Sequence, residues 1–269
     1  MRKILTAITA LLLVTATACE LQPELGLEDG VGDSNDTVYT VGAPSFLLPE
    51  VNTVDETPQP QEGGNAPTSM LAFEGVISPA QALTTLSNLS IVEYNDACAD
   101  TYEREEWKHW SPVDDDPAGT NLNTRHNELR RESLTPVTYS DSMRSVTSGT
   151  WDLVYTTGTT NDPKDLDAEH VLPLGNVHAR ACSAGIEFTA DEKEMIANDP
   201  LLVFMAEKGE NRARGAESWG PSPYGNGWFP SNTAVHCDWI ALQVQLLDYY
   251  FLPITAQELS IADNVLRSC

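Results

Sequence analysis

The sequence predicts an α+β domain that is mainly helical and stabilised by disulfide bonds. Helix-start signals recur along the chain: a Ser or Thr is followed three residues later by Gln or Glu at residues 78–81, 189–192 and 255–258. Two apolar, β-prone runs at residues 169–173 and 201–205 are separated by one of these predicted helices. The domain's cysteines form an even set, which is typical of chains that fold in an oxidising compartment.

The chain has 269 residues and opens with an export signal at residues 1–18. Two basic residues precede an apolar run at residues 4–14 and then a stretch of small residues. The run is too short for a permanent membrane span. An ordinary signal peptidase would cut after Ala18, whereas lipoprotein processing would leave a lipid on Cys19. Setting Cys19 aside leaves the even set of cysteines, which favours the lipoprotein.

Residues 19–70 predict a disordered acidic tether, and residues 71–269 the folded domain. Between residues 20 and 67 the chain holds ten acidic residues and no Lys or Arg. Such a segment cannot bury enough apolar surface to offset the entropy of ordering it. The protein is therefore expected outside the cell or on the cell surface, with membrane contact only through a lipid on Cys19.

The first part of the domain contains four predicted elements. The serine cap, proline and glutamine at residues 78–81 announce a helix. Residues 102–110 are dense in aromatic and charged side chains, which favours a surface helix or loop that pins aromatic rings to the core. The three aspartates at residues 114–116 indicate a solvated turn, with a calcium-binding turn as the alternative. Residues 123–132 predict a capped helix whose charges face solvent or phosphate.

The middle of the domain has the order strand, excursion, strand, helix. A strand within residues 149–155 leads through a polar turn to the acidic stretch that ends in His170. Pro173 then stops the next strand or confines it to an edge. The capping box at Thr189 starts a helix that reaches Asn198. An apolar strand follows, and a helix is expected to begin at Asn211.

The carboxyl-terminal part is predicted to contain two helices. The first runs from about Asn232, carries Cys237 and has an apolar stripe that continues along it. The capping box at Thr255 starts the last helix, which is expected to end at Cys269.

Two runs in the middle of the domain resemble a known family. Residues 167–174 read Asp-Ala-Glu-His-Val-Leu-Pro-Leu, and residues 211–215 read Asn-Arg-Ala-Arg-Gly. They are similar to ββα-metal (His-Me finger, HNH-type) nucleases, and more closely to secreted HNH-family endonucleases related to the carboxy-terminal domain of GmrSD-type restriction enzymes. Those sequences typically read Asp-x-Asp-His-Val-Val-Pro-Leu and Asn-Arg-x-Lys-Gly. The similarity extends over residues 78–269 and includes the aromatic run at residues 102–110 and the Trp-x-Pro at residues 228–230.

The resemblance implies a ββα-metal core embedded in the helical domain, and a site for one divalent cation, Mg²⁺. Glu169 and Asn211 would be its ligands, with Glu169 in place of the family's aspartate. His170 would be the general base that takes a proton from the attacking water. A backbone carbonyl or an asparagine side chain would orient the imidazole, and Asn198 is the candidate asparagine.

The resemblance also implies residues that bind the substrate. Arg214 stands where the family has a lysine, and would counter charge on the phosphate together with Arg212 or Arg125. Asp167 would shape the strand or hydrogen-bond the outer coordination sphere. We predict disulfide bonds Cys237–Cys269 and Cys98–Cys182.

The formal net charge of −25 bears on the substrate. A polyanion is normally attracted by basic surface, so this charge counts against tight binding of DNA or RNA. It counts less against transient cleavage, because local cations can form a positive groove on an acidic body. The expected cluster consists of Arg125, Arg130, Arg131, Lys208, Arg212 and Arg214.

The sequence leaves two rival functions open for what is expected to be a monomer. A non-catalytic, surface-anchored binding lipoprotein would account for the acidity and the tether. Another metal-dependent hydrolase, such as a phosphodiesterase or phosphatase, would share the cation and the base but normally needs more carboxylates to hold two metals.

Overall fold

The computed structural model describes residues 75–113 and 120–269, which all lie in one unit, Glu56–Cys269. The predicted export signal, the lipid on Cys19, the acidic tether and the aspartate turn at residues 114–116 lie outside the described residues. Among the helices described, none combines the length and apolar character needed to span a membrane.

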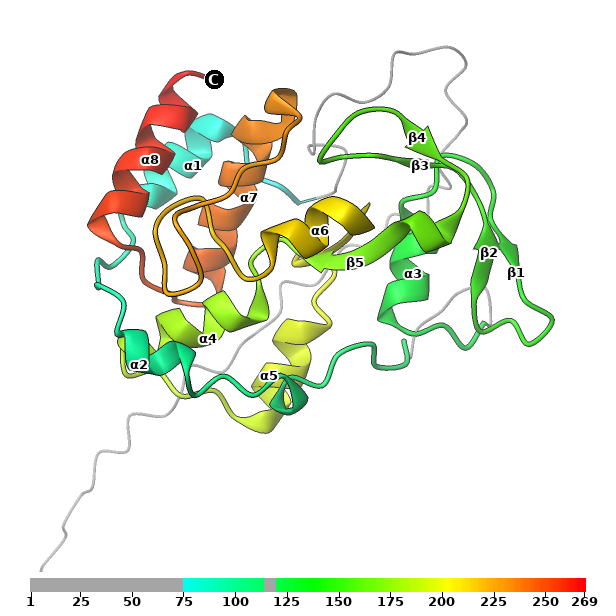
Figure 1. Cartoon of the computed structure of the whole chain (residues 1–269), viewed down its shortest axis with the longest axis horizontal. Helices are drawn as coiled ribbons and strands as arrows, with labels where there is room; N and C mark the ends of the chain where they lie inside the picture. The colour runs from blue at the N-terminus through cyan, green and yellow to red at the C-terminus, as the bar shows by residue number, and fades with distance from the viewer. Residues whose placement is uncertain (1–74, 114–119) are drawn as a thin grey trace, which may run out of the picture. The chain divides into compact units, whose positions relative to one another are not determined.

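Three helices pack together at one end of the domain (Figure 1): α1 (Pro79–Leu86), α7 (His236–Tyr249) and α8 (Ala256–Arg267). Ser78 caps α1 and Thr255 caps α8, each in a capping box with the residue three positions on, as predicted. Helix α7 is preceded by a 3₁₀ turn at Thr233–Val235, and most of its residues are buried. It therefore forms the centre of the main hydrophobic core.

The strands form three separate antiparallel pairs: β1 (Thr138–Tyr139) with β2 (Val146–Ser148), β3 (Trp151–Asp152) with β4 (Thr159–Thr160), and β5 (Leu166–His170) with β6 (Val203–Glu207). The predicted strand at residues 149–155 is thus only the two-residue β3. Helix α3 (Thr124–Arg131), capped by Asn123, packs on β6. The described part is mixed α+β and mostly helical, with short hairpins, as predicted at that level.

The chain between the paired strands β5 and β6 makes the predicted excursion. It forms α4 (Leu174–Ser183) and α5 (Ala190–Ala197), and α5 has the predicted capping box at Thr189. Helix α6 (Lys208–Arg214) follows β6 directly and ends at Gly215, which has a φ of 58°. Short segments earlier in the chain are the helix α2 (Asp96–Ala99) and the 3₁₀ turns Arg104–Glu106 and Pro163–Asp165.

Three predicted boundaries were wrong. The first central strand ends at His170: Val171 and Leu172 are buried beyond the strand, and Pro173 is the N-cap residue of α4. The second starts at Val203, two residues later than predicted. Helix α6 begins three residues earlier than predicted, at Lys208, so that Asn211 lies inside the helix.

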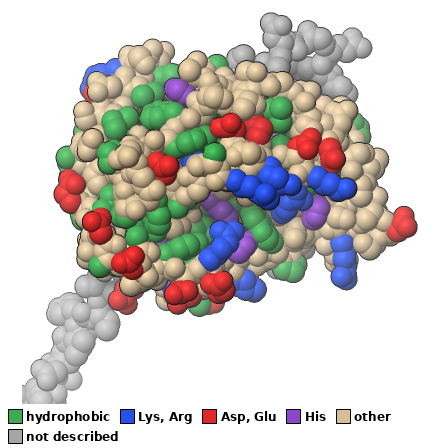
Figure 2. All heavy atoms as spheres, in the orientation of Figure 1, with side chains coloured by type: hydrophobic (Ala, Val, Ile, Leu, Met, Phe, Trp, Pro, Cys, Tyr) green, Lys and Arg blue, Asp and Glu red, His purple; other side chains and the backbone are tan. Residues whose placement is uncertain are grey.

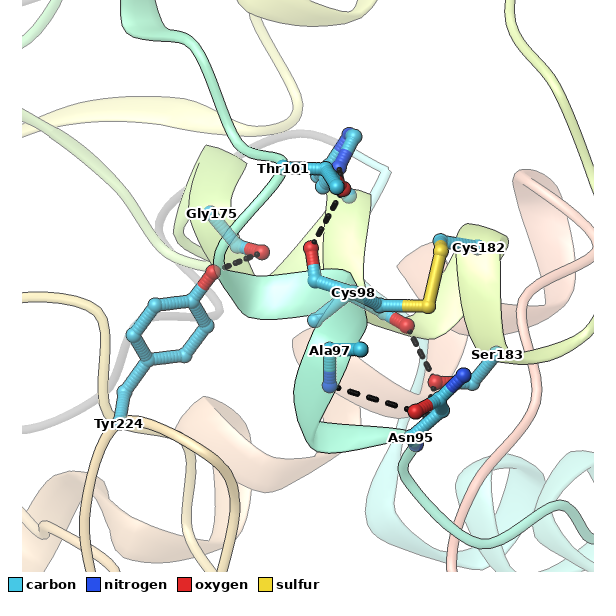
Figure 3. The surroundings of a disulfide bond; sticks show 10 residues. Asn95, Ala97, Cys98, Thr101, Gly175, Cys182, Ser183 and Tyr224 are labelled. Atoms are coloured by element: carbon cyan, nitrogen blue, oxygen red, sulfur yellow. Dashed lines mark hydrogen bonds between the residues drawn. A yellow bond between two sulfur atoms is a disulfide. The ribbon is translucent and has the colours of Figure 1, made fainter.

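Both predicted disulfides are confirmed. Cys98–Cys182 joins α2 to α4, and Cys237–Cys269 joins the start of α7 to the residues after α8. Figure 3 shows the first bond among hydrogen bonds that hold α4: the Ser183 hydroxyl accepts from the Asn95 amide at 2.9 Å, and the Tyr224 hydroxyl donates to the Gly175 carbonyl at 3.0 Å. The disulfide thus fixes α4, the helix that follows β5.

Candidate functional site

The candidate site is built on the antiparallel strand pair β5–β6 and on α6. This helix follows β6 and lies across β5 in Figure 1. The two strands pair from Leu166 opposite Glu207 to His170 opposite Val203. Because side chains alternate along a strand, Asp167 and Glu169 share one face of β5. The arginines of α6 reach that face.

Glu169 is 3% exposed, and two groups bind its Oε1. The Tyr155 hydroxyl donates to it at 3.2 Å, and Nη1 of Arg214 forms a charged hydrogen bond with it. Burial raises the pKa of the Glu169 carboxyl to about 7, although the neighbouring guanidinium opposes the shift. The carboxyl therefore gains its charge near neutral pH.

Arg214 is buried and all of its contacts are internal. Its Nη2 donates to the Val171 carbonyl at 2.6 Å and its Nε to the Glu217 carbonyl at 3.0 Å. The rings of Trp228 and Trp239 lie 5.6 and 5.4 Å from the guanidinium carbon. The structure thus brings Arg214 to the predicted metal ligand, away from the surface where a phosphate would first bind.

His170 is 8% exposed and has a defined tautomer. Its Nε2 lies 2.9 Å from the Ala197 carbonyl oxygen. A carbonyl only accepts, so Nε2 carries the proton and Nδ1 keeps a lone pair. Burial lowers the pKa of the imidazole to about 4, which keeps it neutral at ordinary pH. The Trp110 ring stacks on it, with centroids 5.6 Å apart and planes 22° apart.

The orienting role predicted for Asn198 is not found, because the Ala197 carbonyl holds His170. The Asn198 side chain donates to the Lys108 carbonyl at 2.8 Å and accepts from the Ser111 amide at 2.9 Å. It also accepts from the Thr124 hydroxyl at 2.7 Å. Asn198 therefore ties residues 108–111 to the end of α5 and to α3.

Asn211 lies half-buried on α6, three residues before Arg214 and so on the same side of the helix. Within residues 75–113 and 120–269, no hydrogen bond engages its side-chain amide. Its amide oxygen is therefore available to a ligand on the side of α6 from which Arg214 reaches Glu169.

The remaining predicted residues have separate contacts. Arg212, with a 68% exposed side chain, pairs with Asp167 at 3.2 Å. Arg125 donates to the carbonyls of Pro163 and Leu166, at 3.0 and 3.1 Å, and so fastens the start of β5. Arg125 thus serves the strand and does not point to a free surface.

The site offers few oxygen ligands for a divalent cation. In the part of the chain that the structure describes, no group of three or more His, Cys, Asp or Glu side chains could hold a metal. Glu169 and Asn211 offer a carboxylate and an amide oxygen, which are hard ligands of the kind Mg²⁺ takes. Two protein oxygens are fewer than such an ion takes, so water and phosphate oxygens would have to supply its other ligands.

The basic side chains near the site belong only in part to the predicted cluster. Figure 2 shows Lys, Arg and His side chains gathered around a hollow in the middle of one face. Nη2 of Arg104 lies 3.4 Å from Nε2 of His109, and His109 packs edge-on against Trp110, the ring next to His170. On α6, Nζ of Lys208 donates to the Lys164 carbonyl at 2.6 Å.

Of the six residues predicted to form a positive groove, several are bound internally. Arg130 binds the Asn127 side chain, and Arg131 pairs with the buried Glu128.

The sequence interpretation missed Trp110 and Tyr155. The dense aromatic run at residues 102–110 was the signal that could have indicated the first.

Comparison with known proteins gives one informative relative. The chain is 28% identical over 173 residues to an "Uncharacterized secreted protein" of Arthroderma benhamiae. The aligned region covers 63% of this chain and 76% of the relative. No protein-family model matches the chain, and no solved structure matches it. The relative is named as secreted, and the two disulfides are consistent with an extracellular location.

Proposed function

We propose that the protein is a secreted, metal-dependent endonuclease of the HNH (His-Me finger) type that hydrolyses phosphodiester bonds of DNA or RNA. One arrangement carries the proposal. An antiparallel pair of strands is followed directly by a helix, with a neutral histidine at the end of the first strand. In this proposal β5, β6 and α6 form a ββα-metal core, and residues 71–269 form the nuclease domain.

The proposed reaction uses the free nitrogen of His170. With Nε2 held by the Ala197 carbonyl, Nδ1 accepts the proton from the attacking water. Glu169 and Asn211 would hold the divalent cation, and a cation bound there would offset the negative charge of the phosphate and of the leaving oxygen. With a pKa of about 4, His170 enters the reaction unprotonated, although the same shift makes it a weaker base than an ordinary imidazole.

The geometry assigns different work to the two arginines of α6. Arg214 is enclosed by Glu169, Tyr155 and backbone carbonyls, so in the proposal it holds the carboxylate in place. Arg212 is exposed and its partner Asp167 is partly exposed. A surface pair of this kind is weak, so Arg212 can exchange its carboxylate partner for a phosphate.

The test is digestion of plasmid DNA and of RNA with Mg²⁺, with and without a chelator. We expect His170→Ala to lower the cutting rate by about 100-fold or more, as loss of a general base does. His236→Ala is the matched control, because His236 also places Nε2 against a backbone carbonyl, that of Pro230, at 2.8 Å. Undiminished cutting by His170→Ala would falsify the mechanism.

A binding lipoprotein without catalytic activity is the second candidate. The net charge of −25 favours it, as does the engagement of Glu169 by an internal cation. The same digestion separates the two functions. No cutting by the wild-type protein with any divalent cation, at low or high salt, would support the binding protein.

A further inference from the structure

The backbone at Trp110 is unusual. Its φ is 63°, in the left-handed region that bulky residues rarely adopt. Among the described residues, Met143 and Phe251 are the other non-glycine residues with positive φ. Met143 lies in the turn between β1 and β2, and Phe251 follows α7. Of these three residues, Trp110 is the one that stacks on His170. Strained backbone of this kind persists only when its surroundings enforce it.

The contacts that enforce it lie on both sides of Trp110. The Asn198 side chain binds the Lys108 carbonyl on one side and the Ser111 amide on the other. The Ser111 hydroxyl donates to Glu194 on α5 at 2.6 Å. Trp107, three residues earlier, is fully buried in the main core. The segment therefore cannot relax without breaking contacts to α5.

The same end of α5 also holds His170. Ala197, which binds Nε2 of the imidazole, is the neighbour of Asn198 in the sequence. The last torsion of a histidine side chain has a broad energy profile, so a single hydrogen bond leaves the ring plane loosely defined. The flat face of Trp110, tilted by only 22° from the imidazole, supplies the second restraint.

We propose that Trp110 is a positioning residue for His170: its indole, carried on a backbone that Asn198 clamps at Lys108 and Ser111, fixes the plane of the imidazole and hence the direction of Nδ1. The catalytic consequence rests on the proposed function, whereas the restraint on the ring does not. Trp110 needs no contact with substrate for this role. It acts through the ring that it covers.

The first experiment measures steady-state cleavage of DNA by Trp110→Gly and Trp110→Phe. Glycine accepts the left-handed backbone but removes the ring, whereas phenylalanine keeps a flat face. We expect Trp110→Gly to lower kcat about 10- to 100-fold with KM within about two-fold, as a misplaced catalytic group does. Trp110→Phe should restore most of the rate. In a His170→Ala background, Trp110→Gly should cause no further loss.

A merely structural Trp110 would give a different result. KM and kcat would then change together with a fall in the thermal midpoint, or the loss would be equally large in the His170→Ala background. Either outcome would overturn the proposal. Unchanged kcat in Trp110→Gly would do the same.

The second experiment does not depend on nuclease activity. Nitrogen-15 NMR of the His170 ring should show one Nε2-protonated tautomer in the wild-type protein and in Trp110→Phe. In Trp110→Gly we expect broadened or averaged ring signals and loss of the upfield shift caused by the indole. Identical His170 spectra in the wild type and Trp110→Gly would refute the positioning role. A wild type that cuts no nucleic acid would refute only the proposed function, and the spectra would still decide this inference.

Discussion

Replacing Arg214 with methionine is predicted to destabilise the protein more at high pH than at low pH. In the wild type, burial raises the pKa of the Glu169 carboxyl from 4.5 to about 7, with the Arg214 guanidinium opposing the shift. Methionine removes the cation, so burial alone acts on the carboxyl and its pKa rises further. In the variant, Glu169 is expected to stay protonated well above pH 7.

The size of the effect follows from proton linkage. A carboxyl whose folded pKa is raised contributes stability that is complete below its unfolded pKa and is lost as pH rises through the folded pKa. Both proteins therefore lose stability alike up to about pH 7. Above that pH the wild type stops losing it, while Arg214→Met continues to lose about 1.4 kcal/mol per pH unit. Between pH 6 and pH 8.5 the destabilisation by Arg214→Met should grow by about 2 kcal/mol.

The assay is urea unfolding at these two pH values, followed by fluorescence of the tryptophans that flank the guanidinium, with linear extrapolation to water. Arg214→Met also removes donors from the Val171 and Glu217 carbonyls, but this loss is the same at both pH values. The control is Arg214→Met in a Glu169→Gln background, where the growth with pH should vanish. Equal destabilisation of Arg214→Met at both pH values, or the same growth without the carboxyl, would refute the reasoning.

Three further outcomes are expected. Replacing both cysteines of the Cys98–Cys182 bridge, which spans 84 residues, should lower the free energy of unfolding by about 4.6 kcal/mol. Replacing those of Cys237–Cys269, which spans 32 residues, should lower it by about 3.7 kcal/mol. Urea titration measures both losses. Burial raises the pKa of the Glu132 carboxyl from 4.5 to about 8, so the stability of the folded protein falls as pH rises between these two values. Glu132→Gln should remove this contribution, so that thermal midpoints measured over this pH range decline less steeply. Asn211→Ala should lower metal-dependent cutting by about 100-fold or more with an unchanged circular dichroism spectrum, and full activity would exclude Asn211 as a ligand.

The sequence predicted those parts of the fold that local hydrogen bonds determine. The caps of α1, α5 and α8 link residues three apart, so four consecutive residues were enough to indicate each helix start. Strand limits were less accurate, because they depend on pairing with a distant partner. Val171 and Leu172 are β-prone by type, yet they lie beyond the pairing of β5 with β6.

The candidate site was predictable in its residue types and only partly in its contacts. The histidine and its neighbouring carboxylate were apparent because they are adjacent in the sequence. A backbone carbonyl was one of the two predicted partners of His170, but its residue could not be named, since a backbone carbonyl is independent of side-chain identity and Ala197 carries no signal for the role. Tyr155 and Trp110 contact the site from segments that are distant in sequence, and only the folded chain brings them together.

The position of Arg214 explains why an arginine suits this chain where the resembling family has lysine. A lysine ammonium presents three donors at one point, whereas the guanidinium presents five in a planar fork. Here the fork is used in several directions at once: towards Glu169 and Tyr155, towards the Val171 carbonyl at the end of β5, and towards the Glu217 carbonyl after α6. A lysine could not make all of these bonds, so the arginine joins the strand end to the helix end. In this role the positive charge of Arg214 is paired with Glu169, whereas the sequence interpretation assigned that charge to a phosphate. In the proposed nuclease, attraction of a polyanion to so acidic a protein therefore falls to exposed cations such as Arg212, which pairs with Asp167 on β5.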